Sequence, residues 1–241
     1  MGTVVSFHVR PGSAADAALV LALAEARARL HRADAVFSTW KEESPMSRLR
    51  RGEITLEEAP PEMAVVMQRC DEARQMSGGW FDPWAMPGGV DPTGLVKGWA
   101  AQRALDAIVA AGPAAVMVSA AGDISVWGGP EPGRPWRIGI QDPWRREAII
   151  GVVEVTAAIA TSGTYERGKH IFDPRTGAPA NGIVSATVVG SELDFADALA
   201  TGLMAGGVLA LEHIAVLDGY EALVIDERGS AAATPGFSLV T

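Results

Sequence analysis

The order of helices and strands is the feature of this chain that most restricts its fold. Helices and strands are mixed without the regular strand–helix–strand rhythm of a doubly wound parallel sheet, so an α+β fold is expected. No linker clearly splits the 241 residues, which predicts one domain over residues 1–241 with mixed sheets and flanking helices. The predicted helices cover residues 14–33, 60–78, 96–112 and 194–206, and the predicted strands cover residues 3–10, 114–119, 124–127, 136–141, 149–155, 183–189, 222–226 and 237–240.

Charge and cysteine content narrow the classes of function. A net charge of −9 argues against nucleic acid or an anionic membrane as a partner. The single cysteine, Cys70, lies among apolar helical positions and predicts a buried thiol, with no internal disulfide and no cysteine-based zinc site. No apolar run is expected to reach transmembrane length, and the N-terminus has neither the basic region nor the apolar core of a signal peptide. A cytoplasmic location without stable membrane insertion is therefore expected.

A Pro/Gly turn follows directly after a histidine and an aspartate in residues 170–179. Pro174 fixes its own φ, Gly177 supplies a positive φ, and Asp173 can accept backbone N–H groups. Alternation places His170 and Phe172 on one side of a short strand end. A titratable pair on a rigid turn is one way to hold a catalytic base still, although Asp-Pro turns beside a structural histidine are also common.

Asp197 and Thr201 are spaced i, i+4 and so share one face of an otherwise apolar helix. A carboxylate on an apolar helix needs a partner, and a hydroxyl one turn away adds a second oxygen ligand. Hard oxygen ligands favour Mg²⁺. The alternative is that Asp197 caps the helix and Thr201 packs in the core.

Residues 91–98 form a glycine-containing loop that enters a helix, with Lys97 in the first turn. Such a helix start favours anions, although an ordinary capped helix has the same pattern and the spacing is not that of a Walker A loop. Residues 160–167 are rich in hydroxyl groups and predict a binding loop. Trp40 and Trp80 fall on predicted loops, where an indole suits stacking on a flat ring or partial burial in the core.

Seven segments, in this order along the chain, resemble the motifs of the ApbE-like FAD:protein FMN transferase family. Each motif alone is weak, but together they cover nearly the whole chain, to about residue 207. The segments are Phe37-Ser38-Thr39-Trp40 with Ser47-Arg48-Leu49, Trp80-Phe81-Asp82-Pro83, residues 91–98, Ala121-Gly122-Asp123-Ile124, residues 161–167, residues 170–177 and residues 196–201.

The resemblance implies one α+β domain that binds Mg²⁺ and FAD, and that attaches FMN through a phosphoester to a threonine hydroxyl of an acceptor flavoprotein while releasing AMP. It implies that Asp197, Thr201 and the main-chain oxygen of Gly94 hold Mg²⁺. It places His170 and Asp173 beside the reacting phosphate. The residues that it implies for the FAD site are Met1, Trp40, Trp80, Phe81, Asp82, Asp91, Lys97 and Phe172.

The chain departs from the family pattern at several positions. Arg50 stands where the family usually has asparagine, Ala121 replaces the first glycine of a Gly-Gly-Asp motif, and Thr93 replaces the first of two paired glycines. Arg50 could add a phosphate contact or alter which nucleophile attacks. Two other functions therefore stay open: a Mg²⁺-dependent FAD pyrophosphatase that releases FMN and AMP, and a non-catalytic FAD-binding protein.

Overall fold

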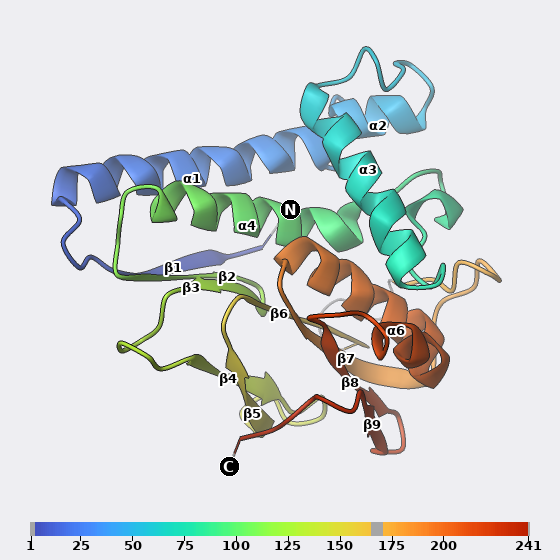
Figure 1. Cartoon of the computed structure of the whole chain (residues 1–241). Helices are drawn as coiled ribbons and strands as arrows, with labels where there is room; N and C mark the ends of the chain where they lie inside the picture. Colours follow the sequence, from blue (N-terminus) through green and yellow to red (C-terminus); the bar gives the residue numbers. More distant parts are fainter. Residues whose placement is uncertain (1–2, 165–170, 241) are drawn as a thin grey trace.

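The computed structural model describes residues 3–164 and 171–240 (Figure 1). The helices are α1 (Asp16–Phe37), α2 (Pro45–Arg50), α3 (Pro61–Met76), α4 (Thr93–Val109) and α6 (Leu193–Ile214), with a 3₁₀ helix η1 at Pro83–Ala85. The strands are β1 (Val5–Arg10), β2 (Ala115–Ala120), β3 (Asp123–Trp127), β4 (Trp136–Gln141), β5 (Ile149–Val155), β6 (Ala158–Gly163), β7 (Ile183–Gly190), β8 (Glu221–Asp226) and β9 (Ala231–Ala233).

One antiparallel sheet runs through the molecule in the order β1-β2-β3-β6-β7-β8-β9, and β4 pairs with β5 in a separate hairpin. Helices α4 and α6 pack on one face of the large sheet, with α1 and α3 outside them (Figure 1). Strands in one sheet without crossover helices between parallel neighbours define an α+β fold. The predicted fold class is therefore confirmed.

Both faces of the large sheet are covered by apolar side chains. The larger core lies between the sheet and the helices and includes the fully buried Leu95, Ile108 and Leu199. A smaller core lies between the sheet and the β4–β5 hairpin and includes Ile140 and Ile159. The Cys70 thiol is buried in the larger core, as predicted, and burial raises its pKa to about 12.

Several local predictions are wrong. Helix α1 begins at Asp16, two residues after the predicted start, and its N-cap residue, Ala15, makes no side-chain capping hydrogen bond. Residues 160–163 of the expected binding loop, 160–167, belong to strand β6, and the short helix α2 is not among the predicted helices. The strand expected at residues 237–240 is reduced to one bridge between Val152 and Val240.

Helix α6 corrects another expectation. By length and composition it is apolar enough to cross a membrane, the one such helix in the described part of the chain. Within the protein, however, 72% of its most apolar window is buried. The helix continues past the predicted end through a kink at Gly207, whose φ of 53° is in the region that favours glycine.

Candidate functional site

A pocket of about 590 Å³ opens where the start of α4, the middle of α6 and the segment after α3 meet. The turn between β2 and β3, the end of β6 and the β4–β5 hairpin complete its wall. This volume lies within the range of about 300–1,000 Å³ that is typical of small-molecule sites. The lining residues are Thr3, Trp80, Phe81, Asp82, Pro83, Met86, Pro87, Asp91, Thr93, Gly94, Lys97, Ala121, Gly122, Gln141, Arg146, Ser162, Gly163, Ile171, Phe172, Asp197 and Thr201.

Two buried carboxylates share one lysine at this pocket. The Lys97 ammonium on α4 donates to Asp123 at the start of β3 and lies 3.5 Å from Asp197 Oδ1 on α6. The amide of Gly98 donates to Asp197 Oδ2 at 3.0 Å, and the amide of Thr161 donates to Asp123 Oδ1 at 3.2 Å. The cluster thus joins α4, α6, β3 and β6 at one point.

The cluster has more negative than positive charge. Asp123 is 0% exposed and Asp197 is 2% exposed, so neither carboxylate is well hydrated. Burial, followed by the nearby Asp123, raises the pKa of Asp197 well above its ordinary value, whereas Lys97 and the Gly98 amide act in the opposite direction. Two carboxylates facing one ammonium favour a further cation or a proton at this position.

The residues present fit a magnesium ion. Thr201 lies one turn after Asp197 on α6, and a Cβ built on Gly94 would come within 3.1 Å of Thr201 Oγ1, so the three residues are adjacent. In a regular helix the Gly98 amide bonds to the Gly94 carbonyl oxygen. In this protein the Gly98 amide also donates to Asp197 Oδ2. The Gly94 carbonyl oxygen has two lone pairs and so can bind a further ligand.

Among residues 3–164 and 171–240, no group of three or more His, Cys, Asp or Glu side chains is arranged to hold a metal ion. The proposed set does not need one. It combines one carboxylate, one hydroxyl and one main-chain carbonyl, which are the hard oxygen donors that Mg²⁺ accepts together with water or substrate phosphate oxygens.

Trp80 forms part of the pocket wall and is only 7% exposed. The Arg175 guanidinium lies 3.5 Å from its ring centroid, and a Cβ on Gly206 would come within 2.4 Å of the ring. Its indole is therefore already packed by the protein. Trp40, by contrast, is 93% exposed and does not line the pocket, so the structure does not bring it to the predicted site.

The pocket brings together most of the predicted site residues. Asp173 is not among them, and its side chain accepts the Arg175 amide at 2.9 Å within the predicted turn. Met1 and His170 lie outside the described residues. Those at the pocket are Trp80, Phe81, Asp82, Asp91, Gly94, Lys97, Phe172, Asp197 and Thr201.

Sequence reasoning missed Asp123, Gln141 and Arg146 as site residues. Asp123 is the ion-pair partner of Lys97, and an acid directly after a glycine turn between two apolar strands was the available signal. Gln141 and Arg146 reach the pocket from the β4–β5 hairpin, and no local pattern indicates that this hairpin folds back onto the site.

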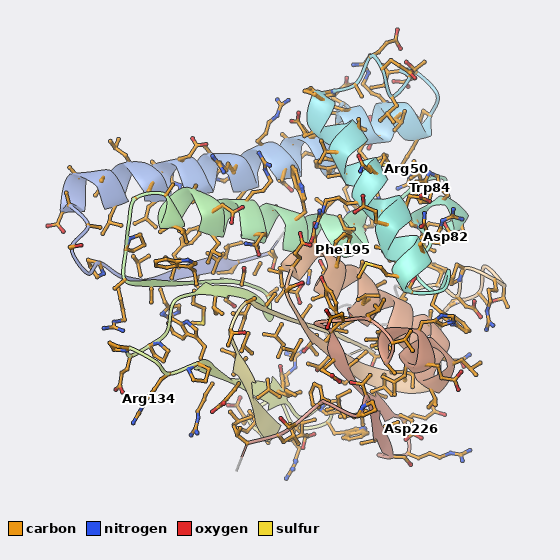
Figure 2. All side chains as sticks on the ribbon, viewed as in Figure 1. Arg50, Asp82, Trp84, Arg134, Phe195 and Asp226 are labelled. Carbon is orange, nitrogen blue, oxygen red and sulfur yellow. The ribbon has the colours of Figure 1, made fainter. Side chains whose placement is uncertain are left out.

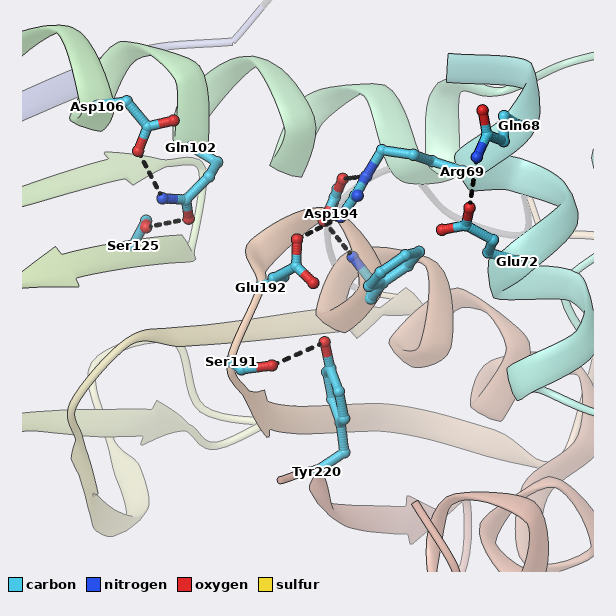
Figure 3. A network of polar contacts seen from close by, with 11 residues as sticks. Gln68, Arg69, Glu72, Gln102, Asp106, Ser125, Ser191, Glu192, Asp194 and Tyr220 are labelled. Carbon is cyan, nitrogen blue, oxygen red and sulfur yellow. Dashed lines mark hydrogen bonds and ion pairs between the residues drawn. The ribbon is translucent and has the colours of Figure 1, made fainter. Parts of the chain in front are cut away.

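A second polar network fixes the N-terminal end of α6 (Figure 3). Arg69 on α3 pairs with Asp194, which is 3% exposed, and with Glu192 at 2.6 Å. Its guanidinium also lies 4.2 Å from the Phe195 ring centroid. Because Asp197 follows one turn later, this network sets the position of the carboxylate in the pocket.

The fold and the site together define an α+β protein with a small-molecule pocket that holds hard oxygen donors for a cation. A family model described as the ApbE family matches residues 1–88 and 85–224. The chain belongs to the ApbE family.

Curated relatives are named FAD:protein FMN transferase. The protein from Rhodobacter capsulatus is 35% identical over 157 residues, which are 61% of this chain and 30% of that protein. The protein from Salmonella typhimurium is 32% identical over 156 residues, which are 60% of this chain and 45% of that protein. The matched stretch thus spans less than half the length of these relatives.

Solved structures show the same fold. The flavin transferase ApbE from Vibrio cholerae has a TM-score of 0.84 at 23% identity and covers 98% of this chain and 95% of its own. The ApbE protein from Thermotoga maritima has a TM-score of 0.81 at 23% identity and covers 97% and 94%. The likeness extends over nearly the whole of each chain and shows that the fold is the same.

Proposed function

We propose that this chain transfers FMN from FAD to a threonine hydroxyl of an acceptor flavoprotein in a Mg²⁺-dependent reaction that releases AMP. The observation that carries the proposal is the buried cluster of Lys97, Asp123 and Asp197 at a 590 Å³ pocket. Transfer of a phosphoryl group depends mainly on positioning and on neutralising phosphate charge. The names of the curated relatives support the same reaction.

In this proposal, Asp197, Thr201 and the main-chain oxygen of Gly94 hold Mg²⁺. When bound, Mg²⁺ would supply positive charge to the phosphate oxygens. The Lys97 side chain is 19% exposed and keeps its ammonium beside both carboxylates, so it orients Asp197 and adds positive charge at the pocket floor. The Gly98 amide fixes the second carboxylate oxygen.

The FAD contacts are proposals as well. Trp80, Phe81, Asp82, Asp91 and Phe172 line the pocket and would bind the nucleotide there. The roles expected for Met1 and Trp40 stay predictions, since the first is not described and the second lies away from the pocket.

The bonds balance as a simple exchange. The threonine oxygen forms a bond to the phosphorus of the FMN half, the bond to the AMP phosphate oxygen breaks, and AMP leaves with that electron pair. The threonine proton passes to a base, for which His170 and Asp173 are the proposed residues. Full transfer by His170→Ala at all pH values would exclude His170 as that base.

The decisive experiment is mass spectrometry of an acceptor flavoprotein domain after incubation with this protein, FAD and Mg²⁺, with AMP assayed in the same tube. We expect an FMN adduct on a threonine, together with AMP, that EDTA and Asp197→Ala abolish. Asp218→Ala, which changes an exposed acid in a turn, is the matched control and should retain transfer.

Two other outcomes would contradict the proposal. AMP and free FMN without an adduct, across several acceptors, would indicate an FAD pyrophosphatase with water as the nucleophile. Bound FAD without AMP would leave a flavin-binding protein. The cytoplasmic location expected from the sequence stays a prediction, which fractionation of cells producing the full-length protein would test.

A further inference from the structure

The guanidinium of Arg50 binds to a single segment of the pocket wall. Arg50 is the last residue of α2, and its Nε donates to the Gly88 carbonyl oxygen at 3.1 Å while Nη2 donates to the Pro87 carbonyl oxygen at 3.1 Å. Its Nη1 lies 3.6 Å from Asp91 Oδ2. The side chain is 17% exposed. Arg50 does not line the pocket. Its positive charge is therefore balanced by these oxygen atoms and not by a phosphate.

The helix that carries Arg50 is itself anchored. The Ser44 side chain accepts the Ser47 amide at 3.0 Å and so caps the N-terminus of α2, and Ser47 Oγ donates to the Ser38 carbonyl oxygen after α1. Met46 is fully buried in the main core. Because α2 is held at its start and along one side, the base of the Arg50 side chain has little freedom.

The segment that Arg50 contacts, residues 86–91, is also held by the Asp91 amide, which donates to the Pro83 carbonyl oxygen at 2.9 Å. Gly88 and Gly89 have φ values of 80° and 98°, so this is a turn that only glycine adopts without strain. The Gly89 amide donates to the Met86 carbonyl oxygen at 3.2 Å. A Cβ on Gly88 would come within 2.9 Å of Arg50 Nη2, so the glycine also permits the close approach of the guanidinium.

The same segment forms one wall of the pocket through Met86, Pro87 and Asp91. In Figure 2, Arg50 lies at the same end of the molecule as Asp82 and Trp84, which precede this segment in the chain. A planar guanidinium has five N–H donors spread over a rigid fork, so it can reach two carbonyl oxygens and a carboxylate that lie apart, whereas a lysine ammonium gathers its three donors at one point.

We propose that Arg50 is a positioning residue that holds the 86–91 wall in the shape that binds FAD. The inference deepens the proposed function and rests on it for the identity of the ligand, but the clamp itself is a property of the free protein.

The test compares Arg50→Gln and Arg50→Lys with Arg48→Gln, a matched control on the same helix whose partner, Glu53, lies away from the pocket. Hydrogen exchange of the free proteins is measured at the Gly89 and Asp91 amides. We expect about tenfold faster exchange in Arg50→Gln, because two charge-assisted hydrogen bonds are lost, and a smaller increase in Arg50→Lys. Exchange in Arg48→Gln and in the α3 and α6 cores should be unchanged.

Flavin fluorescence then gives the FAD dissociation constant, and AMP release gives turnover. We expect FAD binding to weaken by about tenfold in Arg50→Gln, with turnover at saturating FAD retained within about threefold and partial rescue in Arg50→Lys. Unchanged exchange at Gly89 and Asp91 would overturn the clamp. Faster exchange with unchanged FAD affinity would overturn its role in binding. If the unmodified protein bound no FAD, the proposed function would fail, while the exchange result would still decide the clamp.

Discussion

Replacing Asp197 with asparagine should stabilise the metal-free protein, although it removes a residue assigned to the metal site. The carboxylate is 2% exposed, lies beside Asp123 and shares the ammonium of Lys97 with it. Asparagine has nearly the same shape, and its amide oxygen can still accept the Gly98 amide hydrogen. The substitution therefore removes one poorly compensated charge and little packing.

The magnitude follows from that charge. Removing an incompletely compensated buried charge without leaving a cavity is worth on the order of 2 kcal/mol in the free energy of unfolding. For a chain of 241 residues, this corresponds to a rise in Tm of about 4–8 °C.

The stabilisation by Asp197→Asn should depend on pH. Burial and Asp123 raise the pKa of Asp197, so the folded state binds more protons than the unfolded state. The stability linked to this proton is fully present below the unfolded pKa of about 3.9 and is lost as pH rises through the raised folded pKa. Asp197→Asn does not lose stability in this way. The difference in the free energy of unfolding between the variant and the unmodified protein should therefore be small at low pH and increase as pH rises.

Scanning calorimetry in EDTA at about pH 5 and about pH 8.5 measures the effect, with Asp218→Asn as the exposed control. Added Mg²⁺ and FAD should raise Tm of the unmodified protein but not of Asp197→Asn. If Asp197→Asn lowered Tm in EDTA at the higher pH, while the control did not, the charge balance inferred for the cluster would be refuted.

Two further substitutions and one chemical reaction test the packing around the site. Gly98→Ala should destabilise the protein by about 2–4 kcal/mol in urea unfolding, because a Cβ there would lie 2.4 Å from the Leu193 carbonyl oxygen; a loss below about 1 kcal/mol would contradict the close packing of α4 on α6. Ala121→Gly should stabilise it by about 0.5–1 kcal/mol, because Ala121 has a φ of 50°, and a lower midpoint would contradict this. Cys70, whose pKa burial raises to about 12, should react with an aromatic disulfide reagent at neutral pH only after unfolding, so rapid reaction of the native protein would be the contrary result.

Local sequence signals predicted much of the secondary structure. Strands β4 and β5 match the predicted ranges 136–141 and 149–155, and the i, i+4 spacing correctly placed Asp197 and Thr201 on one helix. These signals are periodicity and turn chemistry, which depend on neighbouring residues alone.

The partners across the site could not be predicted in this way. Strand β3 pairs with β6 rather than with β4, which follows it in sequence, and this pairing brings Thr161 to Asp123. Strand pairing between distant segments is set by how both faces of the sheet are buried, not by local pattern. Local spacing and the resemblance to a family both indicated Lys97 and Asp197, but the charge shared among three residues emerges only when α4, β3 and α6 are assembled.

The same limit explains Trp40 and Arg50. An aromatic residue on a predicted loop suits a binding site, yet Trp40, in the segment between α1 and α2, is 93% exposed and does not line the pocket. Arg50 comes directly after the Ser47-Arg48-Leu49 motif, and this position in the sequence does not reveal its contacts. Its hydrogen bonds to Pro87 and Gly88 form only when two segments that are far apart in the chain meet.

Crystals grown with FAD and Mn²⁺ in place of Mg²⁺ would test the central claim most directly, since Mn²⁺ accepts the same hard oxygen ligands and gives an anomalous signal. We predict an anomalous peak bonded to Asp197 and Thr201, next to the Gly94 carbonyl oxygen and the FAD pyrophosphate, within the pocket that Lys97 borders. FAD bound in the pocket with the metal elsewhere, or FAD bound outside the pocket, would contradict it.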